Sequence, residues 1–370
     1  MSAATATPVT GRETRSTPVE RLTEAAIRAF LWAFRVAILL IVVVGSATTL
    51  LQGRTTLNNW LDLIVSGIVV GSIYALISLG YTMVYGILRM INFAHGDIFM
   101  AGAFGGYFTG VALNSLGFLN AGPVQVIISV VLMMVVAMAV AVTIALIVER
   151  IAYRPLRNAP RLVPLISAIG ASFVIEYTFQ GFLGPGVYAY PGIPILAGAV
   201  PLPFKLRWVD LLVIVSALTM MAILYLFVQR TKIGTAIRAV SEDKAAAALM
   251  GIDVNQAIVA TFALGAAMAG VAGVLYGLLY RQVFFLTGFV PGIKAFTAAV
   301  VGGIGNIPGA MAGGLFLGEI ESVGPSLFLT GLGVPSVNQL RDVIAFTMLV
   351  FILVFRPQGL LGERITSQRA

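Results

Sequence analysis

The sequence is dominated by apolar runs, each close to the length needed to cross a lipid bilayer as an α-helix, roughly 20 residues. Only 10% of the residues are charged and 59% are hydrophobic, whereas a soluble domain carries about 25% charged residues. We therefore predict an all-α, polytopic transmembrane helical bundle with about 8–9 spans. The predicted spans are 30–51, 61–86, 90–112, 125–148, 163–183, 210–229, 257–280, a broken stretch at 293–328, and 340–355.

Several kinds of catalytic and cofactor site are disfavoured by what the sequence lacks. It has no cysteine and a single histidine, so we predict no disulfide, no thiolate nucleophile, no metal site and no cofactor. It contains no G-x-x-x-x-G-K-[ST], H-E-x-x-H or G-x-S-x-G motif. We therefore predict a protein that is not an enzyme. If the bundle uses ATP, another chain must bind it.

The basic residues are clustered between the spans and predict which ends of the spans face the cytoplasm. We interpret the net charge of +8 as topology and contact with anionic lipid, and not as nucleic-acid binding. The clusters are Arg12, Arg15, Arg21 and Arg28; Arg150, Arg154, Arg157 and Arg161; Arg230, Lys232, Arg238 and Lys244; and Arg356, Arg364 and Arg369.

The last third of the chain determines where the C-terminal tail lies. A cytoplasmic tail requires that 293–355 cross the membrane an odd number of times. We therefore predict a broken, re-entrant helix pair at 293–328 followed by one crossing. Two ordinary crossings with an external tail are the alternative.

At the other terminus, residues 1–29 are polar and predicted to be disordered. The run after them predicts an uncleaved extra helix, or alternatively a signal peptide with Val36–Gly45 as its apolar core.

The first informative motif places polar side chains inside an apolar span. Asn92, Phe93, His95, Gly96 and Asp97 follow one another closely, and polar groups at that depth are costly unless they are satisfied. One interpretation is a cluster of hydrogen bonds between helices that fixes their packing. The other is a substrate or gating site at a helix break.

The second motif is a glycine-rich interruption within 293–328. Gly303, Gly305, Asn306 and Pro308 cannot continue a helix. In a bilayer such backbone survives when it is buried in protein or lines a cavity. It therefore indicates either a packing kink or part of a translocation path. Because Gly96-Asp97-Ile98 resembles Gly305-Asn306-Ile307, we predict an inverted pair of breaks, with chance similarity as the alternative.

A third motif lies in the cytoplasmic loop at 230–256. Ser241 is a good N-cap, Glu242 and Asp243 favour a first helical turn, an alanine run follows, and Gly251 is a stop signal. We predict a short helix that does not span the membrane. It is either a solvated connector or a docking element for a partner.

Several of these segments together resemble the permease subunit of bacterial branched-chain amino-acid ABC importers. The resemblance covers about 60–365 in order. The motifs that carry it are Tyr81–Ile87 with Ile91–Asp97, Glu149–Arg157, Leu165–Gly170, the 238–252 loop, Lys294–Val300, Gly302–Gly314 and Arg356–Gly362.

The resemblance implies a location in the bacterial inner membrane and a set of partners. These are two cytoplasmic ATP-binding subunits, a second and usually different permease subunit, and a periplasmic substrate-binding protein. It implies that the 241–251 loop meets the ATPase through Glu242, Asp243, Ala247 and Gly251. It also divides the chain into an N-terminal extension at 1–56, with a polar tail and an extra apolar helix, and a permease domain at 57–365.

Other functions stay open from the sequence. Urea or short-chain amides are alternative substrates, because permeases that resemble this family also carry them. An ion-coupled secondary transporter would need acidic residues within spans, for which the candidates are Asp62, Asp97, Glu176, Glu319 and Glu321. A membrane enzyme is disfavoured because no acid–base pair or metal cluster is apparent.

Overall fold

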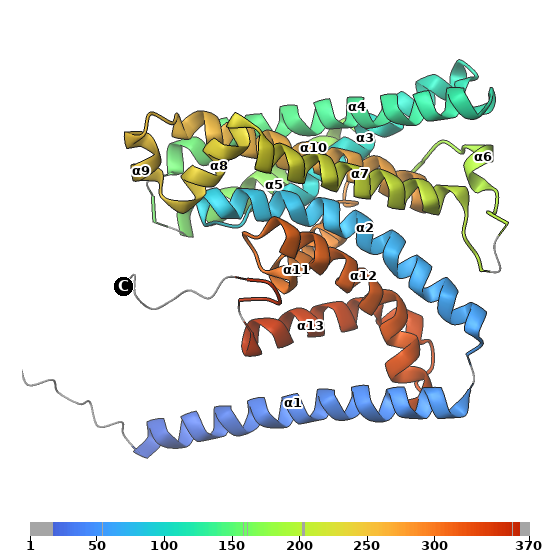
Figure 1. Ribbon diagram of the computed structural model, residues 1–370, viewed down its shortest axis with the longest axis vertical. Helices are drawn as coiled ribbons and strands as arrows, with labels where there is room; N and C mark the ends of the chain where they lie inside the picture. Colours follow the sequence, from blue (N-terminus) through green and yellow to red (C-terminus); the bar gives the residue numbers. More distant parts are fainter. Residues whose placement is uncertain are drawn as a thin grey trace, which may run out of the picture.

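Figure 1 shows the computed structural model, which describes residues 18–362 except 54, 158, 161, 202, 203 and 357. Helices make up most of these residues. The predicted disorder of 1–17 and the basic residues Arg12, Arg15, Arg161, Arg364 and Arg369 lie outside the described residues.

The elements follow one another as helices joined by short connections. The α-helices are α1 Pro18–Gln52, α2 Leu57–Leu88, α3 His95–Ser115, α4 Pro123–Val148, α5 Leu162–Leu183, α6 Pro194–Ala197, α7 Trp208–Arg230, α8 Lys232–Glu242, α9 Lys244–Leu249, α10 Val254–Tyr280, α11 Phe289–Gly302, α12 Ile307–Leu329 and α13 Arg341–Phe355. The short strands β1 Tyr188–Ala189 and β2 Gln282–Val283 pair antiparallel. A π-helical turn, Glu149–Tyr153, and a 3-10 turn, Arg154–Leu156, extend α4; further 3-10 turns are Phe118–Asn120, Thr330–Leu332 and Val337–Leu340.

The polytopic all-α prediction is confirmed. Seven helices in the described part of the chain are long and apolar enough to cross a membrane: α1, α2, α4, α5, α7, α10 and the segment that ends with α13. The glycine-rich α3 and α12 are less apolar and are not among the seven, although they have 21 and 23 residues. The predicted broken pair is α11 and α12, which are separated at 303–306.

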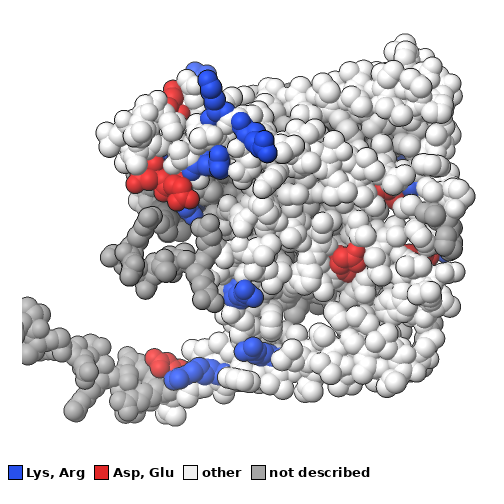
Figure 2. All heavy atoms as spheres, in the orientation of Figure 1, with Lys and Arg blue, Asp and Glu red and all other residues white. Residues whose placement is uncertain are grey.

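The described basic clusters lie at one end of the bundle. The start of α1, the extension of α4, the α8–α9 pair and the end of α13 all lie at the left of Figure 1. Figure 2 shows most of the visible charged side chains at this end, while the rest of this face is nearly uncharged. This is the cytoplasmic end by the positive-inside rule. The end of α13 lies there too, in agreement with the predicted odd number of crossings.

The N-terminal helix begins earlier than predicted, because residues 18–29 are helical rather than disordered. Pro18 suits the first turn of a helix, and the following residues include good helix formers such as Ala25 and Ala26. Glu24 and Arg28 form an ion pair across one turn at 3.6 Å. Local propensity therefore extends the apolar helix by about three turns into the polar segment.

Close backbone contact between α2 and α12 forms the centre of the bundle. A Cβ atom built on Gly318 would lie 2.3 Å from the Cα of Gly71, and one built on Gly314 would lie 2.3 Å from the Cα of Ala75. The two helices can approach this closely only because these positions have no side chain. Gly67 and Gly71 therefore serve helix packing, whereas a Cβ atom at Gly305 would meet nothing within 4 Å in the described part of the chain.

The prediction of an inverted pair is wrong, because α3 and α12 run in the same direction. Contacts pair Gly71 with Gly318 and Ser78 with Ala310, so α12 is antiparallel to α2. Helix α10 starts at the end where α2 finishes, and α3 runs parallel to α10. At each break, the helix before it (α2 or α11) runs towards the cytoplasmic end, and the helix after it (α3 or α12) runs away from that end.

Candidate substrate pathway and coupling loop

The first break places the start of α3 deep within the bundle. After α2 ends at Leu88, the chain turns back, and His95 Nε2 donates to the carbonyl of Ile77 at 3.2 Å. Ile77 lies about three turns before the end of α2, or about 16 Å along its axis. A Cβ atom on Gly80 would lie 2.1 Å from this imidazole, so the ring fits only beside a glycine. The N-terminus of α3 therefore lies at membrane depth.

The five predicted residues of this motif are brought together, but they have different contacts. Asn92, His95 and Asp97 are buried, and Gly96 packs against the backbone of Gly288. Phe93 is partly exposed, and its ring centroid lies 6.3 Å from that of Phe296 on α11. The motif therefore lies at the interface of α2, α3 and α11.

Partners from other helices satisfy the polar groups of this motif. The Tyr153 hydroxyl donates to Asn92 Oδ1 at 2.7 Å, and the Ser172 hydroxyl donates to Asp97 Oδ2. Glu176, one turn further along α5, is also buried. These contacts give the motif the packing role considered from sequence. Phe93 stays partly exposed, and Asn92 Nδ2 has no hydrogen-bond partner within the described part of the chain.

Replacing Tyr153 with phenylalanine is expected to destabilise the bundle by about 1–3 kcal/mol, because Asn92 Oδ1 would lose its buried donor. Thermal unfolding of the detergent-purified protein would show this as a lower midpoint. Tyr225→Phe is the matched control, since Tyr225 is 38% exposed. Equal midpoints for the two variants would contradict the role of this hydrogen bond.

The second break lies at the other end of α11 and is tied to the C-terminal tail. Gly303 and Gly305 have φ values of +107° and +98°, a region that favours glycine. Asn306 caps α12 by accepting from the Gly309 amide at 3.2 Å, and it donates to the Leu361 carbonyl at 2.9 Å. Pro308 lies in the first turn of α12. It therefore starts a helix instead of kinking one.

The two breaks do not meet in this structure. Gly292 of α11 lies against Gly96 at the first break, whereas the second break begins at Gly303, about 16 Å further along α11. The tail covers the second break, because the amides of Leu360 and Leu361 donate to the carbonyls of Val301 and Gly302. Helices α2, α3, α5 and α11 surround the first break, but not the second.

The cytoplasmic loop forms two short helices and not the one that was predicted. Ser241 lies near the end of α8 and is not an N-cap. Asp243 caps α9 by accepting from the amides of Ala245 and Ala246 at 2.8 and 3.0 Å. An aspartate side chain offers a strong acceptor for these free amides, so it takes the capping role. Gly251 has a φ of +82° and ends α9 as predicted.

The tip of this helix pair is apolar and exposed. Leu249 and Met250 are 89% and 82% exposed, whereas Ala247 is buried against the rest of the chain. Glu242 and Asp243 are exposed beside the tip. Of the four residues assigned to docking by resemblance, Ala247 therefore faces inward, and Leu249 and Met250 lie outermost.

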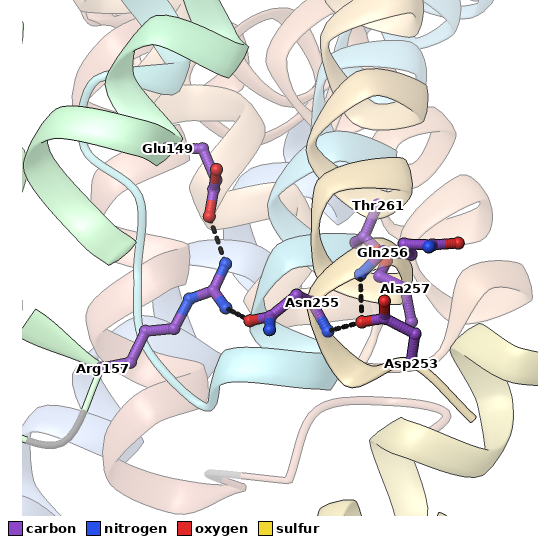
Figure 3. Close-up of polar contacts among 7 residues, drawn as sticks. All are labelled: Glu149, Arg157, Asp253, Asn255, Gln256, Ala257 and Thr261. Atoms are coloured by element: carbon purple, nitrogen blue, oxygen red, sulfur yellow. Dashed lines mark hydrogen bonds and ion pairs between the residues drawn. The ribbon is translucent and has the colours of Figure 1, made fainter. Parts of the chain in front are cut away.

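A polar network beside the helix pair joins the extension of α4 to the start of α10. Arg157 pairs with Glu149 at the end of α4 and donates to Asn255 at the start of α10 (Figure 3). Asp253 caps α10 through the amides of Asn255 and Gln256. Burial, together with the nearby positive charges of Arg157 and Arg89, lowers the pKa of Lys244 on α9. The extension of α4 and the start of α10 therefore form one polar cluster next to α9.

Several of these functional residues had no signal that could be read from sequence. Tyr153 and Arg157 lie in a segment that was noted for its resemblance and its positive charge, and their partners Asn92 and Asn255 are far away in the chain. Leu249 and Met250 follow an alanine run, where two apolar residues do not stand out in an apolar sequence. The exposure of the tip could be found only from the fold.

Comparison with known proteins identifies the family. The family described as "Branched-chain amino acid transport system / permease component" matches residues 63–353. The chain belongs to this permease family. BraD of Pseudomonas aeruginosa, named as a high-affinity branched-chain amino acid transport system permease protein, is 42% identical over 82% of this chain and 96% of its own length.

Two further relatives carry similar names. LivH of Escherichia coli strain K12 is 39% identical over 82% of this chain and 96% of its own length. A probable LivH of Methanocaldococcus jannaschii is 28% identical over 80% of this chain and 90% of its own length. Among solved structures, a chain of PsaBC from Streptococcus pneumoniae in complex with Fab aligns with a TM-score of 0.42 and 12% identity over 84% of this chain and 96% of its own. That similarity is too low to support an argument about this fold.

Proposed function

We propose that this chain is the transmembrane permease subunit of an ABC importer that moves branched-chain amino acids into the cell. The observation that carries the proposal is the exposed apolar tip of the α8–α9 pair at the basic end of the bundle. Leu249 and Met250 have no apolar cover within the described chain, and an apolar tip of this kind suits a groove in a partner. Membership of the permease family supplies the class of substrate.

The partners follow from this function. Cytoplasmic ATP-binding subunits dock on the α8–α9 pair, in contact with Leu249, Met250, Glu242 and Asp243, with Gly251 fixing the end of α9. A substrate-binding protein delivers the amino acid at the opposite end, where β1 pairs with β2. A second permease chain, of the same or a different sequence, completes the pathway. Lipid covers the remaining apolar surface.

Transport proceeds by alternating access without covalent chemistry in this chain. The first break, with Asn92, Phe93, His95, Gly96 and Asp97, forms a wall of the pathway at membrane depth. The second break, with Gly303, Gly305, Asn306 and Pro308, acts as a hinge that the tail holds at the cytoplasmic end. Hydrolysis in the partner moves the α8–α9 pair, and α8, which contacts α7 and α10, carries this movement into the bundle.

Uptake by cells tests the choice of substrate. A host that lacks its own importers for leucine and urea would express this chain together with its partner subunits. We expect saturable uptake of labelled leucine that unlabelled isoleucine and valine inhibit, and no uptake of labelled urea. Urea uptake without leucine uptake would contradict the proposed substrate class.

A further inference from the structure

A buried ion network joins helices α11, α12 and α13. Lys294 Nζ on α11 lies 2.7 Å from Glu321 Oε1 on α12 and 2.6 Å from Asp342 Oδ1 on α13. The same ammonium lies 5.8 Å from the centroid of the Tyr74 ring on α2. Ionisable groups within a membrane bundle are costly and commonly mark a pathway.

Two buried polar atoms of this network lack a hydrogen-bond partner in the described part of the chain. Glu321 is 8% exposed, and in the described part of the chain no hydrogen bond reaches its Oε2 atom. Arg341, beside Asp342, also has a buried Nε without a partner in the described part of the chain, and its Nη2 donates to Asn338 Oδ1 at 3.4 Å. A network that only held helices together would be expected to satisfy its buried atoms.

The two unpaired atoms belong to one site. Lys294 pairs with both Glu321 and Asp342, and Arg341 directly precedes Asp342, while the charges of Glu321, Arg341 and Asp342 also act on Tyr280. Tyr280 ends α10, and its ring lies 4.4 Å from that of Tyr276, centroid to centroid. The side chain of Asp342 is 55% exposed, so the network reaches the surface of the chain.

The charges of the site match a zwitterion. Lys294 and Arg341 supply two positive charges, and Glu321 and Asp342 supply two negative charges. One acceptor and one donor remain free, which is what an α-ammonium and an α-carboxylate require. No group of three or more His, Cys, Asp or Glu residues suited to a metal ion occurs among the described residues.

We propose that Glu321 Oε2 and Arg341 Nε bind the α-ammonium and the α-carboxylate of the amino acid as it enters the permease, beside the tyrosines of α2 and α10. This site rests on the proposed function, because it requires a substrate that carries both charges. It adjoins the first break along α11, because Lys294 lies two residues after Gly292, which packs against Gly96. It gives the pathway a means of recognising the backbone of an amino acid whatever its aliphatic side chain.

Uptake by the reconstituted importer tests the site. The permease would be assembled in proteoliposomes with its partner subunits and supplied with labelled leucine. Glu321→Gln is expected to lower the initial rate at low leucine concentration by about tenfold or more, as for loss of a hydrogen bond to a charged group. Glu319→Gln, the same change two residues earlier on α12, is expected to leave the rate unchanged. A normal rate for Glu321→Gln would overturn the proposal.

A second variant separates binding from folding. If Glu321 serves only to neutralise Lys294, then removing both charges in Lys294→Met with Glu321→Gln should restore uptake. If Glu321 binds the substrate, the double variant should remain defective while it still elutes as an assembled complex. Restored uptake would overturn the proposal.

A panel of labelled compounds distinguishes this proposal from the proposed function. Uptake of another amino acid that depends on Glu321 would support the site and refute branched-chain selectivity. Leucine uptake that does not depend on Glu321 would refute the site and support the function. Uptake of urea alone, or of no amino acid, would overturn both.

Discussion

Replacing Gly314 with leucine is expected to prevent the bundle from assembling. A Cβ atom at this position would lie 2.3 Å from the Cα and 2.4 Å from the backbone nitrogen of Ala75. Backbone cannot move aside as a flexible side chain can, so α12 would have to separate from α2. The cost should exceed the ~1–3 kcal/mol that is typical of an overpacked core, and α12 would also lose its contacts with Gly71 and Ser78.

The yield of monodisperse protein in detergent measures this effect. We expect Gly314→Leu to aggregate or to be degraded. Gly170→Leu is the matched control, because Gly170 on α5 has nothing within 4 Å of a Cβ position. A normal yield for Gly314→Leu would show that the close approach of α2 and α12 is not required.

Introducing charge at the tip of the helix pair is expected to abolish ATP-driven transport while the chain still folds. Leu249 and Met250 are 89% and 82% exposed, so Leu249→Asp with Met250→Asp removes no contact within the described chain. In the docked complex the same carboxylates would be buried without partners, which costs several kcal/mol. A loss of this size lowers affinity by at least about a hundredfold.

Affinity capture of the ATP-binding subunits and leucine uptake measure this loss together. Leu51→Asp is the control, since Leu51 is 88% exposed and lies at the opposite end of the bundle. We expect that control to retain both the subunits and the uptake. Normal capture and uptake by the tip variant would show that α9 is not the docking element.

Much of the fold could be predicted from the sequence, because the bilayer imposes simple rules. Apolar length predicted the spanning helices, and the basic loops predicted their direction. The glycines at 303–305 predicted a break, which occurs there because two of them take positive φ values. The start of α1 was placed too late, since helical propensity carries the helix beyond the apolar run into residues 18–29.

Relations between distant segments could not be predicted. The similarity of Gly96-Asp97 to Gly305-Asn306 suggested inversion, but the direction of each helix depends on the packing of α3 on α10 and of α12 on α2. Asp243 takes the cap that Ser241 was expected to provide, because its carboxylate reaches two amides. The network at Lys294 needs three helices to come together, and Glu321 was noted only as one of several acidic residues.

ATP-dependent leucine uptake in proteoliposomes tests the central claim most directly. The permease would be reconstituted with the ATP-binding subunits and the substrate-binding protein, and labelled leucine would be measured inside the vesicles. We predict accumulation only when ATP is present on the side of the basic loops, and none when the ATP-binding subunits are omitted. Accumulation against a gradient by the permease alone, without ATP, would contradict the account.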